Sequence, residues 1–274
     1  MKQNSDRGRW SILTSTLTLI ICFISSYAFY QYLVLLFAEG LGLQANFTFN
    51  EVFLPMDPNE WDQAKATEVT LYPLAICFLL GTTIFFLIKN QRESWGRFQL
   101  GGFWTMVCLI NIPISQILYA PLGAGDTKAV FYYGFARFAH ENHISFAFQL
   151  ILSIIGIIVV MYLGFHLCKQ VLKFSHSYSF IEKRAGKNKM VMRIYVLPIL
   201  MAALPLLSLG KDVATVRLAI MVFVLMIPVI GIFMRNARAN YQVNFKKSGT
   251  GDSFPIIELI AAAGIWAFVY IYLA

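Results

Sequence analysis

The stretch LILSIIGIIVVMYL, which covers residues 150–163, decides the fold class of this chain. It contains no charged residue, and its apolar side chains would cover every face of a helix, which is typical of a helix in lipid or in a large protein core. The whole chain favours lipid, because 58% of its 274 residues are apolar, 13% are charged and the mean hydropathy is +0.64. Soluble globular proteins have about 45–50% apolar and 25% charged residues. The composition predicts an integral membrane protein and excludes a soluble enzyme, a disordered chain and a disulfide scaffold.

Seven apolar stretches are long enough to cross the ~30 Å hydrocarbon layer, which takes about 20 mainly apolar residues. They cover residues 10–38, 70–88, 100–120, 144–168, 194–210, 218–234 and 255–274. The fifth and sixth have only 17 residues each, so the alternative is a six-span protein in which these two form a re-entrant hairpin. The segments between the spans are too short to fold alone. We therefore expect an all-α, polytopic membrane helix bundle that forms a single domain over residues 1–274.

The basic residues predict the orientation of these spans. Of the 22 Lys and Arg residues, 17 fall on the side of the N-terminus and 5 on the other side. Cytoplasmic loops carry this excess, so the N-terminus is expected inside and the C-terminus outside. The net charge of +8 then reflects this bias and attraction to the bilayer, not nucleic-acid binding. The most basic inner loop, from Lys169 to Arg193, is expected to contact anionic lipid headgroups or an acidic partner.

The apolar stretch near the N-terminus is expected to stay as a helix. It is far longer than the 7–15 apolar residues of a signal peptide, and no small-residue cleavage site follows it. The four cysteines all fall within spans and say nothing about redox compartment. A plasma membrane or a bacterial inner membrane is the expected location.

The second outer loop carries the first candidate site, a polar group formed by Asp126, His140, Glu141 and His143. On a helix, His140 and His143 would share one face, and Arg137 and Glu141 would be spaced for an ion pair. Two histidines beside carboxylates suit Zn²⁺ or another divalent metal, although a third ligand would have to come from a neighbouring loop. The acidic residues available there are Asp57, Asp62, Asp126 and Asp212. The alternatives are a proton-handling or substrate-contacting role, and histidines that simply lie in a wet interface.

The second candidate site lies in the inner half of the bundle. His166 is near the end of the fourth span and Glu258 is about one turn into the seventh. Ionisable groups within a membrane usually face the bundle interior and act in function. Because both residues lie at a similar depth, they were candidates for a proton-handling pair. Alternatively, Glu258 reaches the headgroups or is neutralised by Arg235 or Arg238.

Several prolines interrupt the predicted spans, and each removes an internal hydrogen bond and favours a kink. They are Pro73, Pro113, Pro198, Pro205 and Pro228. Pro198 and Pro205 share one face of the fifth span, so this span is expected to bend most. Transporters use such broken helices to expose backbone groups to a substrate.

No catalytic motif names a reaction. The sequence has no HExxH zinc-protease motif, no serine nucleophile motif, no P-loop and no GxGxxG. Three functions remain: a small transporter or permease subunit, with or without a proton-linked step; an accessory subunit that packs against a larger membrane protein; and a membrane-embedded metalloenzyme with its site at the outer face. Whether the chain is an enzyme stays open, and fold alone does not decide it.

Overall fold

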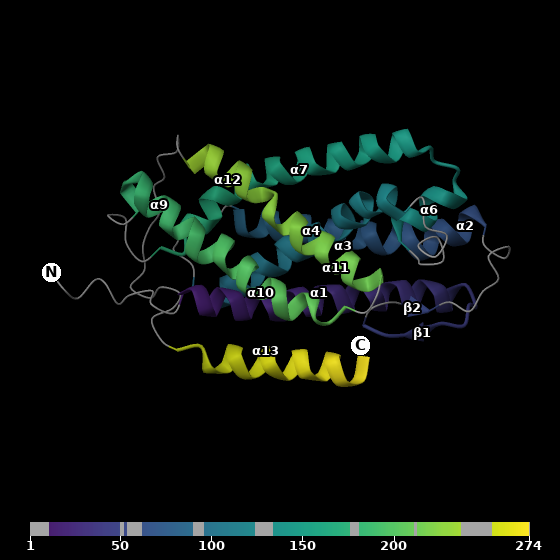
Figure 1. Ribbon diagram of the computed structural model, residues 1–274, viewed down its shortest axis with the longest axis horizontal. Helices are drawn as coiled ribbons and strands as arrows, with labels where there is room; N and C mark the ends of the chain where they lie inside the picture. Colours follow the sequence, from purple (N-terminus) through teal and green to yellow (C-terminus); the bar gives the residue numbers. More distant parts are fainter. Residues whose placement is uncertain are drawn as a thin grey trace.

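The structure is a computed structural model that describes residues 11–49, 52–53, 62–89, 96–123, 134–175, 181–210, 213–236 and 254–273. These residues form a helix bundle with a single short strand pair, β1 (Asn46–Phe47) with β2 (Val52–Phe53) (Figure 1). The α-helices are α1 (Ser11–Gly40), α2 (Gln63–Ala66), α3 (Tyr72–Lys89), α4 (Arg97–Gly123), α6 (Phe135–Glu141), α7 (Phe146–Leu172), α9 (Arg184–Val191), α10 (Leu197–Leu207), α11 (Val213–Met226), α12 (Pro228–Asn236) and α13 (Ile256–Phe268). Three π-helical segments continue them, η3 (Thr67–Leu71), η4 (Met192–Val196) and η5 (Val269–Leu273). The prediction of an all-α polytopic bundle is confirmed.

Six helical segments in the described part of the chain are long and apolar enough to cross a membrane. They cover Ser11–Gly40, Gln63–Lys89, Arg97–Leu122, Phe146–Leu172, Arg184–Leu207 and Ala214–Asn236. The fifth and sixth segments, expected to be the shortest, have 24 and 23 residues. The fifth helix begins earlier, in polar sequence at its inner end, and the sixth extends past the predicted apolar run at both ends. The shorter apolar helix is instead the last one, Ile256–Ile271. The alternative in which these two segments form a re-entrant hairpin is therefore wrong, and the segment below the length of a span is the seventh.

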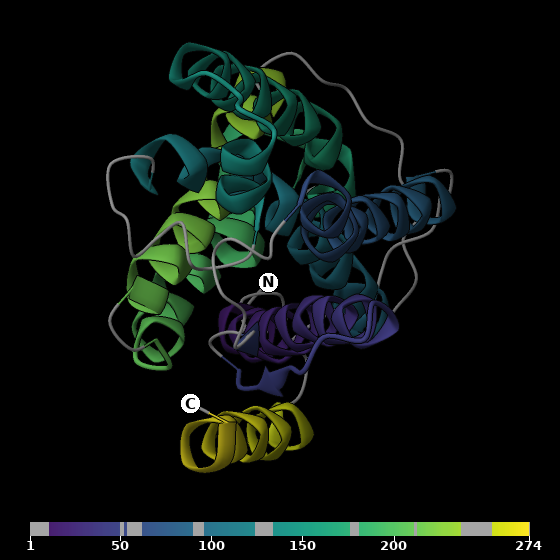
Figure 2. The same ribbon diagram turned by 90° about the vertical axis from the view of Figure 1, so that its right-hand side faces the viewer.

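Helix α4 lies at the centre of the bundle, where it contacts α1, α3, α7 and α11. Its side chains Leu100, Phe103, Trp104 and Met106 are completely buried. Both views place α7 on one side of this centre and α13 on the opposite side, beyond α1 (Figures 1 and 2). The inner ends of the helices, as the charge bias orients them, lie on the left in Figure 1 with α9, and α2, α6 and the strand pair lie at the outer end.

A proline in the fifth span creates a contact that joins three helices. Pro198 has no amide hydrogen, so the carbonyl of Ile194 loses its helical donor, and η4 directly precedes this point. The Ser15 hydroxyl of α1 donates to the Ile194 carbonyl at 2.7 Å. The Trp104 indole of α4 in turn donates to Ser15 Oγ at 2.9 Å. The group released by the proline therefore becomes a tertiary hydrogen bond in the core.

A second proline is used in the same way, and the carbonyl of a third accepts a tertiary hydrogen bond near a helix end. Pro121, inside α4, releases the carbonyl of Ile117, which accepts a hydrogen bond from the Ser153 hydroxyl of α7 at 3.2 Å. At the end of α10, the carbonyl of Pro205 accepts from the Trp266 indole at 2.8 Å. The first bond joins α7 to α4, and the second joins α13 to α10.

The sixth span is interrupted, although the fifth was expected to bend most. Ile227 separates α11 from α12, because Pro228 cannot donate to the carbonyl of Val224. That carbonyl accepts instead from the amide of Ile227 at 3.2 Å. The carbonyl of Leu225, next to the break, accepts from the Tyr195 hydroxyl at 3.0 Å. The carbonyls of Val224 and Leu225 at the break therefore both have donors.

Beyond this break, α12 packs closely on α7 through two glycines. A Cβ atom at Gly164 would lie 2.1 Å from the carbonyl oxygen of Pro228, and one at Gly231 would lie 2.0 Å from that of Met161. Both clashes involve backbone, which cannot rotate away. Only glycine allows the two helices to approach this closely, as at other small-residue crossings in membranes.

We expect Gly164→Ala to lower the free energy of unfolding by about 1–3 kcal/mol, because a methyl group forced into a packed contact displaces the α7 and α12 backbones. The measurement is thermal unfolding of the detergent-purified protein. Gly102→Ala in α4 is the matched control, since nothing lies within 4 Å of its added Cβ. Equal midpoint temperatures for the two variants would contradict the glycine crossing.

Candidate functional site

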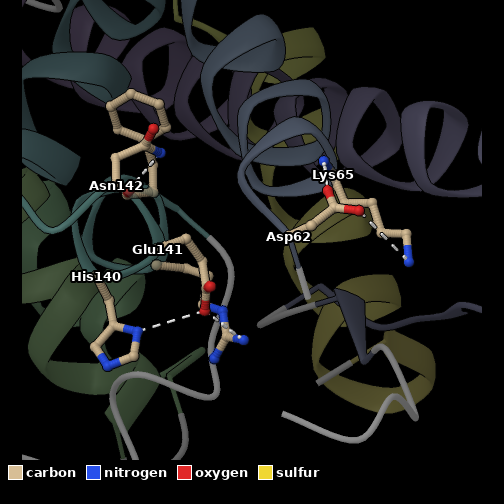
Figure 3. Close-up of polar contacts among 7 residues, drawn as sticks. Asp62, Lys65, His140, Glu141 and Asn142 are labelled. Atoms are coloured by element: carbon tan, nitrogen blue, oxygen red, sulfur yellow. Dashed lines mark hydrogen bonds and ion pairs between the residues drawn. The ribbon is translucent and has the colours of Figure 1, made fainter. Parts of the chain in front are cut away.

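The outer candidate residues gather around one carboxylate at the end of α6 (Figure 3). Glu141 Oε1 lies 2.7 Å from Arg137 Nη2 and 3.4 Å from His140 Nδ1. Arg137 is buried, whereas the side chain of His140 is 60% exposed. Burial lowers the pKa of Arg137, and the charge of Glu141 opposes that shift. The predicted Arg137–Glu141 pair is therefore present, and its first role is to neutralise a buried guanidinium.

The remaining members of the predicted metal site are not brought into this cluster. His143 follows α6 with a φ of 51°, in the left-handed region, and Asp126 lies outside the described residues. Asp62 accepts from the Lys65 amide at 2.7 Å and so caps α2 (Figure 3), while Asp57 and Asp212 lie outside the described residues. Within the described ranges, no three His, Cys, Asp or Glu side chains are grouped to hold a metal ion. A metal centre at His140 and His143 stays a prediction without a described third ligand.

The inner candidates His166 and Glu258 lie on different sides of the bundle. Glu258 Oε1 is 3.2 Å from Arg97 Nη1, so the carboxylate at the start of α13 pairs with the start of α4. The expected neutralisation of Glu258 is present, but the partner is Arg97 and not Arg235. His166 lies on α7, opposite α13 in both views (Figures 1 and 2). The structure therefore does not bring the two residues together as a pair.

His166 instead lines an apolar pocket of about 280 Å³ between α3 and α7, with α4 behind it. This volume is close to the lower end of the roughly 300–1,000 Å³ of small-molecule sites. Phe86 and Tyr162 are largely exposed, so the pocket opens sideways, at the surface of the bundle between α3 and α7. The residues that line it are Phe78, Thr82, Phe85, Phe86, Lys89, Ile110, Val159, Tyr162, Leu163 and His166.

The ionisable nitrogen groups that line this α3–α7 pocket, Lys89 and His166, lie at its inner end. The Lys89 ammonium lies 5.7 Å and 5.8 Å from the ring centroids of Phe85 and Phe86, as in cation–π contacts. The His166 ring meets the Tyr162 ring edge to face at 4.7 Å. Arg235 of α12 lies just beyond, with its guanidinium carbon 4.5 Å from the centre of the Phe165 ring. The pocket is therefore apolar along its walls and cationic at one end.

A small void of about 10 Å³ continues inward from this pocket. Ile110 and Leu163 line both spaces, so these two side chains form the wall between them. Asn111 of α4 lines the void and donates through Nδ2 to the carbonyl of Met221 at 2.9 Å. Its Oδ1 is buried and accepts no hydrogen bond from the described residues. A polar atom therefore lies in the bundle core one side chain behind the pocket.

Lys173, which follows α7, fixes the inner end of α3. Its side chain is completely buried, and its ammonium donates to the carbonyls of Ile88 at 3.3 Å and Lys89 at 3.5 Å. A cation at a helix C-terminus also interacts favourably with the helix dipole. Burial lowers the pKa of Lys173 to about 8, and the nearby charge of Lys169 adds to this shift. Lys173 thus positions the backbone that carries Lys89.

Sequence reasoning identified His166 but missed the pocket around it. Lys89 ends a span and was counted only as a cytoplasmic charge, and Tyr162 lies within an apolar run. The matching depth of Lys89 and His166 at the inner ends of two spans was a readable signal. Which two spans lie side by side was not readable, because lipid-facing and core-facing helices here have similar apolar sequences.

At the outer cluster, we expect Glu141→Gln to lower the free energy of unfolding by about 1–3 kcal/mol, because Arg137 would keep its charge without a carboxylate. His140→Gln is the control and should change stability by less than about 0.5 kcal/mol, since the ring is exposed. Thermal unfolding checks this difference. Elemental analysis of the same samples tests the metal hypothesis, which instead predicts a bound metal that His140→Gln removes.

The lowered pKa of Lys173 predicts a pH dependence of stability. Between pH 8 and 10.5, the unfolded state holds the Lys173 proton more tightly than the folded state, so the contribution of Lys173 to stability rises with pH. We expect Lys173→Met to remove part of this rise. Chemical unfolding at several pH values across the window measures it, with the exposed Lys183→Met as the control. An unchanged slope in Lys173→Met would contradict the assignment.

Comparison with known proteins identifies no relative of this chain. No protein-family model, curated protein or solved structure that was compared with the chain matches it. The function of this multi-pass membrane protein is therefore inferred from its own residues.

Proposed function

We propose that this multi-pass membrane protein is a small transporter whose substrate is amphiphilic and enters sideways from the bilayer through the α3–α7 pocket. The observation that carries the proposal is the pocket itself, which is apolar, open at the bundle surface and cationic at its inner end. A water-soluble substrate would favour a polar vestibule between the helices. A pocket with apolar walls and a few convergent polar groups suits a molecule with a long apolar part.

The dimensions of the pocket support a substrate with an acyl chain. From Phe78 to Lys89, eleven residues of α-helix rise about 16 Å, close to half of the ~30 Å hydrocarbon layer. Val159 and His166 mark a similar middle-to-inner range on α7. The pocket therefore covers the depth of one leaflet, and its polar end lies where a headgroup lies.

The interrupted helices next to the pocket support movement of the substrate beyond it. The break at Ile227 lies in the helix pair that packs on α7, and Pro228 lines the void behind Ile110 and Leu163. Transporters place their substrate sites at such discontinuous helices. Asn111 gives that void a polar atom near the middle of α4. A proton-linked form of the proposal rests on His166 alone, since Glu258 is paired with Arg97.

Val159→Trp tests the transport route, because the larger indole would fill the pocket from its α7 wall. We expect it to slow the protein-dependent movement of a fluorescent single-chain lipid across proteoliposome membranes by about tenfold or more. Ile158→Trp is the matched control, since Ile158 is the adjacent exposed residue of α7 and does not line the pocket.

Two outcomes would contradict the proposal. Equal rates for the two tryptophan variants would exclude the α3–α7 pocket as the route. A rate for the unmodified protein no faster than that of protein-free liposomes would exclude transport of this substrate class altogether.

A further inference from the structure

We propose that the α3–α7 pocket selects an anionic, single-chain amphiphile from the inner leaflet and holds its phosphate or carboxylate group between Lys89, His166 and Arg235. This inference rests on the proposed function and names the chemical class of its substrate. The acyl chain occupies the apolar walls between α3 and α7. The oxyanion lies at the inner end, where the Lys89 ammonium and the His166 ring line the pocket and the Arg235 guanidinium lies over the adjoining Phe165 ring.

The charge at the inner end of the pocket has one sign. None of the described residues that line the pocket is acidic, and its charged lining residue is Lys89. Lys89 and His166 both line this end of the pocket, and Arg235 lies over the ring of Phe165, whose centroid is 6.2 Å from that of His166. Glu258, the carboxylate at the same depth, pairs with Arg97 across the bundle. The inner end therefore complements an anion and gives a neutral headgroup no equivalent attraction.

Each of the cations is held in place before a ligand arrives. The Arg235 guanidinium lies over the Phe165 ring and donates to the Phe165 carbonyl at 3.0 Å. The Lys89 ammonium lies beside the rings of Phe85 and Phe86, and Lys173 fixes the carbonyl of Lys89. Donors that are already oriented lose less entropy on binding an anion than mobile side chains do.

The single chain follows from the shape of the site. The cavity of about 280 Å³ lies at the lower limit for a small-molecule ligand, and its length matches one leaflet. Ile110 and Leu163 close the wall that faces the bundle core, and the void of about 10 Å³ lies behind them. One acyl chain uses this space, and a second chain would remain in the bulk lipid outside Phe86 and Tyr162.

The test measures binding of spin-labelled amphiphiles to the full chain in neutral phosphatidylcholine vesicles. The probes are a single-chain alkyl phosphate and the alcohol with the same chain. The fraction of probe with restricted motion reports binding to the protein. We expect the unmodified protein to favour the alkyl phosphate over the alcohol by about tenfold or more. Because each interfacial cation contributes about 1 kcal/mol to attraction of an anion, removing one should lower this preference about fivefold.

The variants are Lys89→Gln, His166→Gln and Arg235→Gln, and the control is Lys183→Gln, which removes an exposed inner-side charge away from the pocket. We expect the first three to lose preference for the phosphate while they still bind the alcohol. Loss of preference in Lys183→Gln of the same size would show a general surface-charge effect and overturn the proposal. Equal preference in Lys89→Gln, Arg235→Gln and the unmodified protein would also overturn it.

Val159→Trp separates this inference from the proposed function. If it abolishes binding of both probes while the charge variants keep full phosphate preference, the pocket stands and the anion selectivity fails. If it changes neither probe, the pocket itself fails. The last measurement is competition by inorganic phosphate. If inorganic phosphate displaces the labelled alkyl phosphate as strongly as unlabelled alkyl phosphate does, the site binds simple anions, which would contradict the proposal of an amphiphilic ligand.

Discussion

A backbone carbonyl inside a bilayer must find a donor within the protein, and this constraint organises the bundle. Each proline within a span removes one amide donor, and an unsatisfied polar group in hydrocarbon costs several kcal/mol. In this chain, hydroxyl groups of neighbouring helices supply the missing donor, as Ser15 does for Ile194 and Ser153 for Ile117. The prolines thus create directional contacts between helices that are otherwise joined by apolar packing, which carries little information about orientation in lipid.

The same constraint accounts for the position of the pocket. The break at Pro228 allows α12 to cross α7 at Gly164 and Gly231, so that α12 covers one side of α7. A second close crossing, at Gly81, joins α3 to α4, where an added Cβ would lie 2.7 Å from Ile110. With α7 drawn toward α12 and α3 drawn toward α4, the inner halves of α3 and α7 face each other across a space lined by apolar side chains. Lys173 joins them only at the inner end.

The sequence was sufficient for the fold class and for most of the spans, because a helix crosses a bilayer when it is apolar and long enough, and both properties can be read from sequence. It misjudged the ends of the fifth and sixth spans, since Arg184 and Asn236 belong to helices that extend past the apolar run. It singled out the fifth span for bending and did not point to the sixth, where the helix is interrupted at Ile227. Carbonyls near the prolines find donors in both spans, from Ser15 in the fifth and from Tyr195 in the sixth.

The candidate sites were predicted less completely than the spans, for a physical reason. Local spacing was enough for the Arg137–Glu141 pair, which lies on one turn of α6. Pairing of His166 with Glu258 required knowing which helices are adjacent, and equal depth alone did not give this. The contacts of the Lys169–Arg193 loop with anionic lipid, the orientation in the membrane and the single-domain assignment stay predictions.

The attachment of α13 has a consequence for the order in which the bundle is assembled. This helix packs against α1 and is joined to the other helices by the Arg97–Glu258 pair and the Trp266 indole. At about 5–20 residues per second, more than two hundred residues separate the synthesis of α1 from that of α13, which takes about 10–40 s. During this interval the side of α1 that later contacts α13 is in contact with lipid or with the machinery that inserts the nascent chain. A helix made late therefore covers one made early, and this side of α1 is closed only after α13 has been made.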